Sequence, residues 1–368
     1  MRVLRLFAPL ALVAILAPLT ARADLAVGID HYQSGRYQEA EAELQAAVQA
    51  APDSDSAHYM LGLSLLKLDR AAEAVEHLRH AVELNPQKYE YQHSLGAALY
   101  EQKNYAEAIA VLERAEPAAP DDEVRSTLLG LRGMAHAQLE HWEPAMADLQ
   151  RALQAKPSPG LRVQLARAQM GTGKLDEGRA TLRAVAGEAP EDPAVQRAVV
   201  EAIIAAAGSA DPEQGKALYV EAMGPAQVYQ RLQPGFEASF LLGQAALGAG
   251  QYPQSEQALS AALAEKPGFC PALLSLGMAQ AWQEKWPEAE RNLSESTRCA
   301  QQPPAIHEAL GYVQIKQNKL AEALASYQAA HQIQPTETNT KAIEALQARL
   351  GAGGGSPQEQ EEKDGGRR

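Results

Sequence analysis

The chain has 368 residues, a formal net charge of −13 and a hydrophobic fraction of 46%. Because proteins hold phosphate groups mainly through Lys and Arg, this acidic balance excludes nucleic acid as an expected partner and predicts repulsion from anionic lipid surfaces. The acidic residues are interpreted either as a solubilising exterior or as an attraction for a basic partner. No long stretch alternates polar and apolar residues, so we expect no β-sheet and an all-α fold.

The first 23 residues have the pattern of a secretion signal. Arg2 and Arg5 precede an apolar run at residues 6–19, and residues 21–23 (Ala-Arg-Ala) form a small-x-small cleavage site. We therefore expect cleavage after Ala23 and a periplasmic or secreted protein. The apolar run is short for a membrane-spanning helix, although an uncleaved anchor is the alternative. No later segment is long and apolar enough to span a membrane, so no span is expected in the mature chain.

From residue 24 to residue 335 a pattern recurs with a period of about 34 residues. One position of the pattern is a glycine: Gly62, Gly96, Gly133, Gly243, Gly277 and Gly311. Twelve residues later comes Ala or Ser: Ala74, Ala108, Ala145, Ser255, Ala289 and Ala323. Four residues further comes Leu or Tyr: Leu78, Leu112, Leu149, Leu259, Leu293 and Tyr327. Self-similarity at this period predicts a solenoid of helix–turn–helix units.

The small residues of the pattern have one physical explanation. A side chain beyond Cβ at the glycine position would hold the two helices of a copy apart, and the Ala or Ser serves the second helix in the same way. The Leu fills the space between the helices. Pro86, Pro120, Pro157, Pro267 and Pro335 close most copies and stop the second helix.

Five copies cover residues 24–190 and three more cover residues 236–335. The fifth copy is atypical, because Ala166 replaces the glycine and Gly178 replaces the alanine. Residues 191–235 are interpreted as a degenerate copy. This gives about nine copies, well above the minimum of about three that a stable stack needs.

Within the degenerate copy, residues 193–207 and 212–223 are expected to be helical, with extra residues near 224–235. After the last copy, residues 336–350 form an amphipathic pattern that predicts a capping helix over the last apolar face. Residues 351–368 are rich in Gly, Gln and charge and show no hydrophobic periodicity, so we expect a disordered tail.

The pattern closely resembles the tetratricopeptide repeat family over most of residues 24–335. The resemblance implies an α-solenoid wound as a right-handed superhelix that binds proteins or peptide segments. It also implies that the first helix of each copy lines an inner groove. Transferred to this chain, the groove positions include Tyr32, Tyr59, Leu63, His93, Tyr100, Met134, Arg167, Phe240, Gln244, Met278, Trp282 and Tyr312.

These groove candidates are mostly aromatic and apolar, and such side chains are the commonest interface anchors. Some of the tyrosines are instead expected to pack against a neighbouring copy. The family's clamp for a peptide C-terminal carboxylate needs Lys and Asn where Leu25 and Ile29 stand, so that ligand is not expected. Trp142 and Trp286, at the seventeenth position of their copies, are expected to pack in the turn.

No catalytic, cofactor-binding or metal-binding constellation is found, so we expect neither an enzyme nor a cofactor. Residues 171–174 (Gly-Thr-Gly-Lys) match a phosphate-binding loop only in part, because Ala168 and Leu175 replace two required residues. His77 and His80 lie one helical turn apart. Without a third ligand we interpret them as part of a solvated face and not as a metal site.

Cys270 and Cys299 are the only cysteines. They fall at the first and thirtieth positions of one copy, and antiparallel helices bring these positions side by side. In an exported protein we expect such a pair to form a disulfide. Two buried thiols that act as small apolar fillers are the alternative.

These observations favour a periplasmic scaffold or adaptor that holds peptide segments or partner proteins during assembly of an envelope structure. Outer-membrane machinery, a pilus, a secretion system or polysaccharide export would each suit such a protein. A regulatory or substrate-presenting subunit of a cell-wall enzyme is the alternative.

Overall fold

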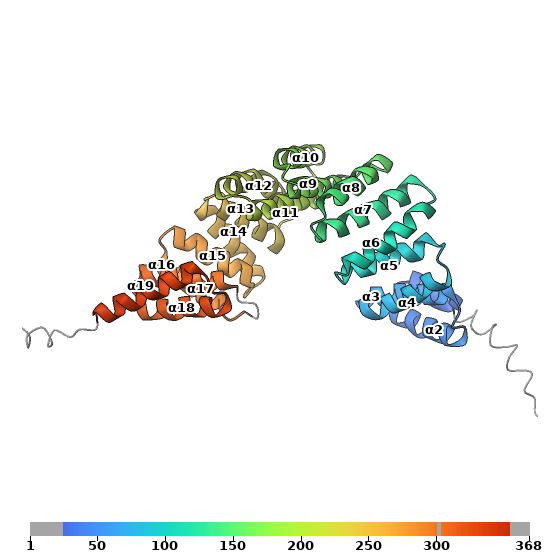
Figure 1. The fold of residues 1–368 in the computed structure, drawn as a ribbon, viewed down its shortest axis with the longest axis horizontal. Coiled ribbons are helices and arrows are strands. Elements are labelled where there is room, and N and C mark those ends of the chain that lie inside the picture. The colour runs from blue at the N-terminus through green and yellow to red at the C-terminus, as the bar shows by residue number, and fades with distance from the viewer. Residues whose placement is uncertain (1–24, 300–302, 354–368) are drawn as a thin grey trace, which may run out of the picture. The chain divides into compact units, whose positions relative to one another are not determined.

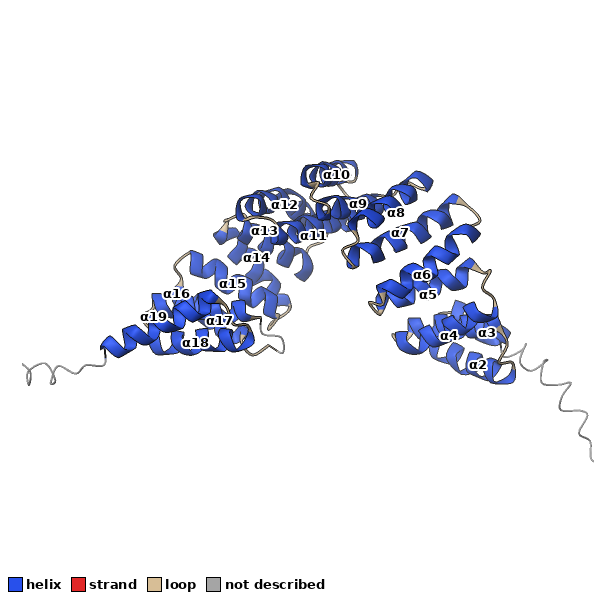
Figure 2. Ribbon diagram, viewed as in Figure 1, coloured by secondary structure: helices blue, strands red, loops and turns tan. Residues whose placement is uncertain are grey.

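A computed structural model describes residues 25–299 and 303–353. The predicted signal peptide and its cleavage site, and nearly all of the predicted tail, lie outside the described residues. Within the described ranges the chain consists of helices and short connections, and no strand is present (Figure 2). The predicted all-α, helix–turn–helix architecture is confirmed.

The chain forms two compact units, and the division falls within α10, so that unit 1 ends at Leu182 and unit 2 begins at Arg183. Residues 25–33 form the first helix of unit 1. The following helices of unit 1 are α2 (Tyr37–Ala50), α3 (Asp55–Lys67), α4 (Ala71–Leu84), α5 (Tyr89–Glu101), α6 (Tyr105–Ala115), α7 (Asp122–Gln138), α8 (Trp142–Ala155), α9 (Pro159–Gly171) and α10 (Leu175–Glu188) (Figure 1). A short 3-10 turn, η1 (Glu116–Ala118), follows α6.

Unit 2 continues the same alternation of first and second helices. Its helices are α11 (Pro193–Ser209), α12 (Pro212–Leu232), α13 (Phe236–Gly248), α14 (Tyr252–Glu265), α15 (Cys270–Trp282), α16 (Trp286–Ser296), α17 (Pro304–Lys316), α18 (Leu320–Ile333) and α19 (Glu337–Gly353). The described residues therefore hold nine helix pairs and the additional helix α19.

The recurring glycines are the points of closest approach within each pair. A Cβ added at Gly96 would lie 2.7 Å from Cγ of Leu112, and one added at Gly277 would lie 2.6 Å from Cγ of Leu293. Contacts this short do not occur in folded proteins, so any side chain at these positions would force the helices apart. The explanation of the glycine–leucine spacing is confirmed.

The fifth copy reaches the same close approach from the opposite helix. A Cβ added at Gly178, in α10, would lie 2.8 Å from the carbonyl oxygen of Ala166 and 2.5 Å from Cγ of Met170. Because Gly and Ala exchange positions in this copy, the glycine lies on the second helix instead of the first. The close packing of the two helices is kept.

The degenerate copy is a helix pair, α11 with α12. The extra residues near 224–235 lengthen α12, which continues through Pro225 to Leu232. Ala222, Ala226 and Tyr229 are buried along one stripe of this helix, so the continuation keeps adding apolar contact beyond the position where a standard second helix ends.

The last helix, α19, lies against α18 and begins one residue after the predicted start of a cap. Leu346 is buried and joins a cluster with Ala323 and Tyr327. The helix extends to Gly353, three residues into the predicted tail. None of the helices in the described part of the chain is both long enough and apolar enough to cross a membrane.

Ion pairs link successive copies at a fixed register. The cation at the sixteenth position of one copy contacts a glutamate at the twenty-first position of the preceding copy. The pairs are Arg70 with Glu41 at 2.6 Å, Lys285 with Glu256 at 2.6 Å and Lys319 with Glu290 at 2.5 Å. Such partly exposed pairs contribute little individually, but they hold neighbouring copies in one orientation.

Candidate functional site

Unit 1 has a shallow hollow of about 460 Å³ on the first helices of three successive copies. Its walls are formed by α5, α7 and α9. The residues that line it are His93, Ala97, Ser126, Thr127, Gly130, Leu131, Met134, Lys156, Ser158 and Leu161. Of the predicted groove residues, His93 and Met134 are therefore brought together, whereas Ala97, Gly130 and Leu161 were missed by sequence reasoning.

Small residues create this hollow at positions where other copies carry large ones. Gly130 occupies the fifth position of its copy, where the second copy has Tyr59 and the seventh has Phe240. Ala97 occupies the ninth position, where the second copy has Leu63. A scan of the groove positions for unusually small residues would have found the hollow, because the missing volume is visible in the sequence once the register is known.

Gly130 also lets the next copy approach. A Cβ at this position would lie 2.6 Å from Cδ2 of Leu161, so the first side chain of α9 that faces the hollow packs directly on the backbone of α7. The hollow is thus bounded by close packing at one end and is open at the other.

The polar groups around the hollow are already engaged. The Ser126 hydroxyl donates to the carbonyl of Lys156 at 3.5 Å, and the Thr127 hydroxyl donates to the carbonyl of Glu123 at 3.0 Å. The Lys156 ammonium pairs with the Glu123 carboxylate. Burial lowers the pKa of His93, so its imidazole is neutral near pH 7. The hollow therefore suits an uncharged, apolar group.

The predicted tyrosines of unit 1 are partly buried against other rings. Tyr32 meets Tyr37 and Tyr100 meets Tyr105, with ring centroids 5.6 and 5.2 Å apart. Tyr59 lies 4.4 Å from Tyr91 between centroids. These three side chains therefore contribute to structural contacts between helices and are partly exposed. Leu63 and Arg167 are also partly buried.

In unit 2 the predicted residues fall into two groups. Phe240 is partly buried against a cluster that includes Leu259 and Leu276, and its ring lies 5.2 Å from that of Phe269 between centroids. Gln244 and Met278 are partly buried. Trp282 and Tyr312 are different, because 61% and 43% of their surfaces are exposed.

The two tryptophans expected to pack in turns do so. A Cβ at Gly171, in the next copy, would lie 2.3 Å from the Trp142 ring, so this indole is seated against a glycine. Trp286 is partly buried against a cluster that includes Leu293 and Leu310.

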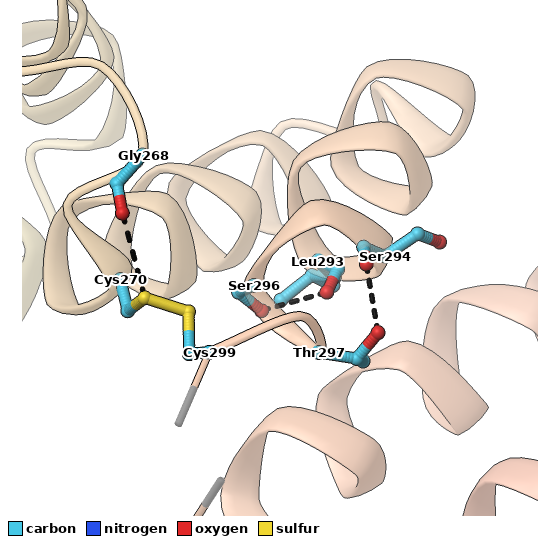
Figure 3. Close-up of a disulfide and its surroundings, with 7 residues drawn as sticks. All are labelled: Gly268, Cys270, Leu293, Ser294, Ser296, Thr297 and Cys299. Carbon is cyan, nitrogen blue, oxygen red and sulfur yellow. Dashed lines mark hydrogen bonds between the residues drawn. A yellow bond between two sulfur atoms is a disulfide. The ribbon is translucent and has the colours of Figure 1, made fainter. Parts of the chain in front are cut away.

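Cys270 and Cys299 form the predicted disulfide, with a Cα–Cα distance of 6.3 Å (Figure 3). It joins the first residue of α15 to the segment after α16, which ends at Ser296. The alternative of two free buried thiols is therefore wrong for this structure.

A histidine group in the second copy corrects one sequence interpretation. His58 is buried, and its Nε2–H donates to the carbonyl of Pro52 at 3.0 Å, so its Nδ1 accepts from Nδ1–H of His77 at 3.0 Å. The interpretation of His77 as part of a solvated face is therefore wrong. The 34-residue period could not show this contact, because it does not reveal which side chain of α3 lies opposite His77. Burial lowers the pKa of both rings. No group of three or more potential ligands in residues 25–299 and 303–353 is arranged to hold a metal ion.

One buried ion pair replaces an apolar contact in the fourth copy. Arg132 stands where most copies have Leu, and its guanidinium donates twice to the Asp148 carboxylate at 2.6 Å. Glu116 lies 3.3 Å from the same guanidinium. The hydrogen bonds to Asp148 raise the pKa of Arg132 further. The sequence marks Arg132 as unusual, but its partners lie on α8 and η1 and become visible only in the structure.

Comparison with solved structures finds repeat proteins of low sequence identity. MamA from Desulfovibrio magneticus RS-1 is 21% identical, with 45% of this chain and 93% of that chain covered and a TM-score of 0.42. TTC0263, a TPR protein of Thermus thermophilus, is 27% identical, with 50% and 98% covered and a TM-score of 0.38. PilF from Pseudomonas aeruginosa is 17% identical, with 73% and 99% covered and a TM-score of 0.43.

Comparison with curated proteins finds no match. Two family models match the sequence, and both describe the tetratricopeptide repeat. The matched segments are residues 5–57, 25–89, 59–123, 138–203, 221–268 and 274–338. These segments cover most of the chain, and the chain therefore belongs to the tetratricopeptide repeat family.

Proposed function

We propose that this protein is an exported scaffold of the cell envelope that holds a partner segment on the first helices of unit 1, with one apolar side chain of the partner seated in the hollow at Gly130. Proteins of this repeat family are protein-interaction scaffolds, and their fold is typically non-enzymatic. The observation that carries the proposal is the hollow itself, which is built from small residues at groove positions and whose neighbouring hydroxyls already have hydrogen-bond partners.

The envelope location rests on two supports. The basic and apolar N-terminal pattern is that of a secretion signal. The Cys270–Cys299 disulfide is compatible with an oxidising compartment such as the periplasm.

The proposal is tested by filling the hollow. Ala97→Leu places at the ninth position the residue that the second copy carries there, Leu63. The matched control is Ala106→Leu, on the exposed face of the second helix α6. Peptides selected from a random display library on the wild-type protein should bind Ala97→Leu at least about tenfold more weakly, because an occupied anchor pocket costs about 1.4 kcal/mol or more.

Binding to Ala106→Leu should be unchanged, and circular dichroism should show the same helicity for all three proteins. Selected peptides that lack a common apolar residue, or that bind wild type and Ala97→Leu equally, would place the binding surface elsewhere.

A further inference from the structure

The second helix of the eighth copy ends earlier than most second helices do. This copy begins at Cys270, so α16 spans the seventeenth to the twenty-seventh position and ends at Ser296. Second helices of 14 residues, which reach the thirtieth position, are α2, α4, α8, α10, α14 and α18. The next copy begins at Pro304, so the eighth copy has the usual length of 34 residues. An insertion or deletion therefore does not explain the early end of α16.

A proline does not explain the early end either. The helix α6 also stops at the twenty-seventh position, and there Pro117 follows two residues after the end of the helix. In contrast, the eighth copy has no proline between Pro287 and Pro303, and Gln301 stands where most copies have their closing proline. Since the other copies rely on proline to end the second helix, α16 must end for a different reason.

The disulfide distinguishes this end of the eighth copy from all others. Cys299 occupies the thirtieth position, where a full-length second helix has its last residue, and it is bonded to Cys270 at the first position (Figure 3). The peptide N–H groups of Arg298 and Cys299 donate to the carbonyls three residues earlier, at 3.1 and 3.3 Å. The chain after α16 therefore forms tight turns in place of a continuing α-helix.

Two hydroxyl groups occupy backbone carbonyls at the point where α16 stops. The Ser296 hydroxyl donates to the carbonyl of Leu293 at 2.6 Å, and the Thr297 hydroxyl donates to the carbonyl of Ser294 at 2.8 Å (Figure 3). In a longer α-helix the Ser294 carbonyl would accept from the N–H of Arg298. Rotation of the threonine side chain is enough to free this acceptor, so these hydrogen bonds do not prevent α16 from continuing.

We propose that the Cys270–Cys299 disulfide is a site of thiol–disulfide exchange that sets the length of α16. Both cysteines are partly exposed, and exposed disulfides belong to the labile, regulatory class. The partner is an exported dithiol protein with a Cys-x-x-Cys motif. Once it has reduced the bridge, α16 continues to the thirtieth position and leaves four residues before Pro304, as many as lie between α14 and α15.

The exchange is a two-electron reduction in two steps. A thiolate of the partner attacks Sγ of Cys299, a mixed disulfide forms, and the bond to Cys270 breaks. Cys270 leaves as a thiolate at the N-terminus of α15, where the helix dipole stabilises negative charge, and then takes a proton from water. Its thiol hydrogen can be donated to the carbonyl of Gly268, whose oxygen lies 3.4 Å from Sγ.

The second cysteine of the partner then attacks the mixed disulfide and releases Cys299, which is protonated. The partner loses two electrons and two protons to the Cys270–Cys299 pair and becomes a disulfide itself. The bridge remains the resting form in an oxidising envelope. This inference goes beyond the proposed function and uses no residue of the hollow in unit 1, so either can fail without the other.

The first experiment measures access to the bridge in the folded protein. The full oxidised chain is incubated with reduced thioredoxin at urea concentrations below the unfolding transition, and alkylated cysteines are counted by mass spectrometry. We expect both cysteines to become alkylated at a rate that does not depend on urea, because exchange at an exposed bridge requires no unfolding. Absence of reduction, or a rate that rises with urea together with the unfolded fraction, would overturn the proposal.

The second experiment measures the length of α16 by nuclear magnetic resonance. On reduction, the 13Cα chemical shift of Arg298 should move to an α-helical value, whereas that of Gln332, at the same position of the ninth copy, should not move. The matched variant is Arg298→Pro, which introduces at the twenty-ninth position the proline that the third copy has there, Pro117. When both proteins are reduced, Cys299 should have a helical shift in wild type and a non-helical shift in Arg298→Pro.

Complete reduction that leaves the Arg298 shift of the wild type unchanged would overturn the proposal. The same holds if Cys299 has one and the same shift in the two reduced proteins. Circular dichroism shows that each protein remains folded.

Discussion

Two junctions between copies, one in each unit, use the same position of the repeat in opposite ways. In unit 1 the ring of Trp142, at the seventeenth position of its copy, is seated against Gly171 at the thirteenth position of the next copy. In unit 2 the equivalent ring, Tyr252, meets Trp282 at the thirteenth position, which stacks on it and remains exposed. One register position therefore builds a packed junction when it is glycine and an exposed ring pair when it is tryptophan.

The units also differ in how they reinforce a copy. The fourth copy has the buried pair Arg132 and Asp148, where the eighth copy has Leu276 and Asn292 at the same register. The eighth copy is instead closed by the Cys270–Cys299 disulfide. In these two copies the repeat fixes the spacing of the helices, and each of the two adds a different bond to it.

The largest expected effect comes from breaking the buried pair of unit 1. Asp148→Ala leaves the Arg132 guanidinium, whose side chain is 10% exposed, with only the more distant Glu116, and should cost about 3–5 kcal/mol. Urea unfolding followed by circular dichroism measures the loss. The double variant Arg132→Leu with Asp148→Asn introduces the residue types that the eighth copy has at these two positions. It should recover most of the lost stability. A double variant as unstable as Asp148→Ala would show that the charge itself is needed.

The next effect comes from the covalent link of unit 2. Replacing both cysteines by serine opens a loop with a sequence separation of 29 residues and should cost about 3.6 kcal/mol in the chain-entropy model. Reduction of the disulfide in the wild type should lower the unfolding midpoint as much as the double serine substitution does. Mass spectrometry after non-reducing alkylation of protein taken from the cell envelope should find neither cysteine alkylated. Two alkylated cysteines would contradict both the bridge and the oxidising location.

A smaller effect tests the packed junction directly. Gly171→Ala places a Cβ 2.3 Å from the Trp142 ring and should cost about 1–3 kcal/mol. The control is Gly187→Ala in α10, where nothing lies within 4 Å of the new Cβ and the next residue is not proline. That substitution should stabilise the helix by about 0.5–1 kcal/mol, because Ala has the higher helix propensity. Equal effects of the two changes would mean that the Trp142 ring is not seated on Gly171.

The smallest effect is a pH dependence confined to the second copy, whose His58 and His77 occupy the register of Leu273 and Asn292 in the eighth copy. Burial lowers the pKa of both histidines in the folded state. At a pH between the folded and unfolded pKa values, the unfolded chain therefore binds more protons than the folded chain. The stability that this pair contributes is complete above pH about 6.5 and is lost as the pH falls toward the lower folded pKa values. His80, Glu73 and Glu76 are the charged groups nearest to the pair and modulate the shift.

Hydrogen exchange read by mass spectrometry should show α3 and α4 losing protection between pH about 7 and pH about 5, while α15 and α16 do not. In His58→Leu this difference should disappear. Loss of protection at the same rate in both copies would mean that the histidine pair does not control the response.

The period of the sequence by itself determined the fold class, the helix pairs and the disulfide partners. This was possible because each helix pair closes where a small residue meets a larger one, as at Gly96 and Leu112, and this requirement recurs at a fixed spacing. The same period could not reveal contacts between side chains that occur once. The His58–His77 hydrogen bond, the partners of Arg132 and the exposure of Trp282 were decided by tertiary structure, because each depends on which residue a neighbouring helix happens to present. The hollow at Gly130 depends on both. Its small residues can be recognised in the sequence, but the hollow forms only because α5, α7 and α9 pack around them.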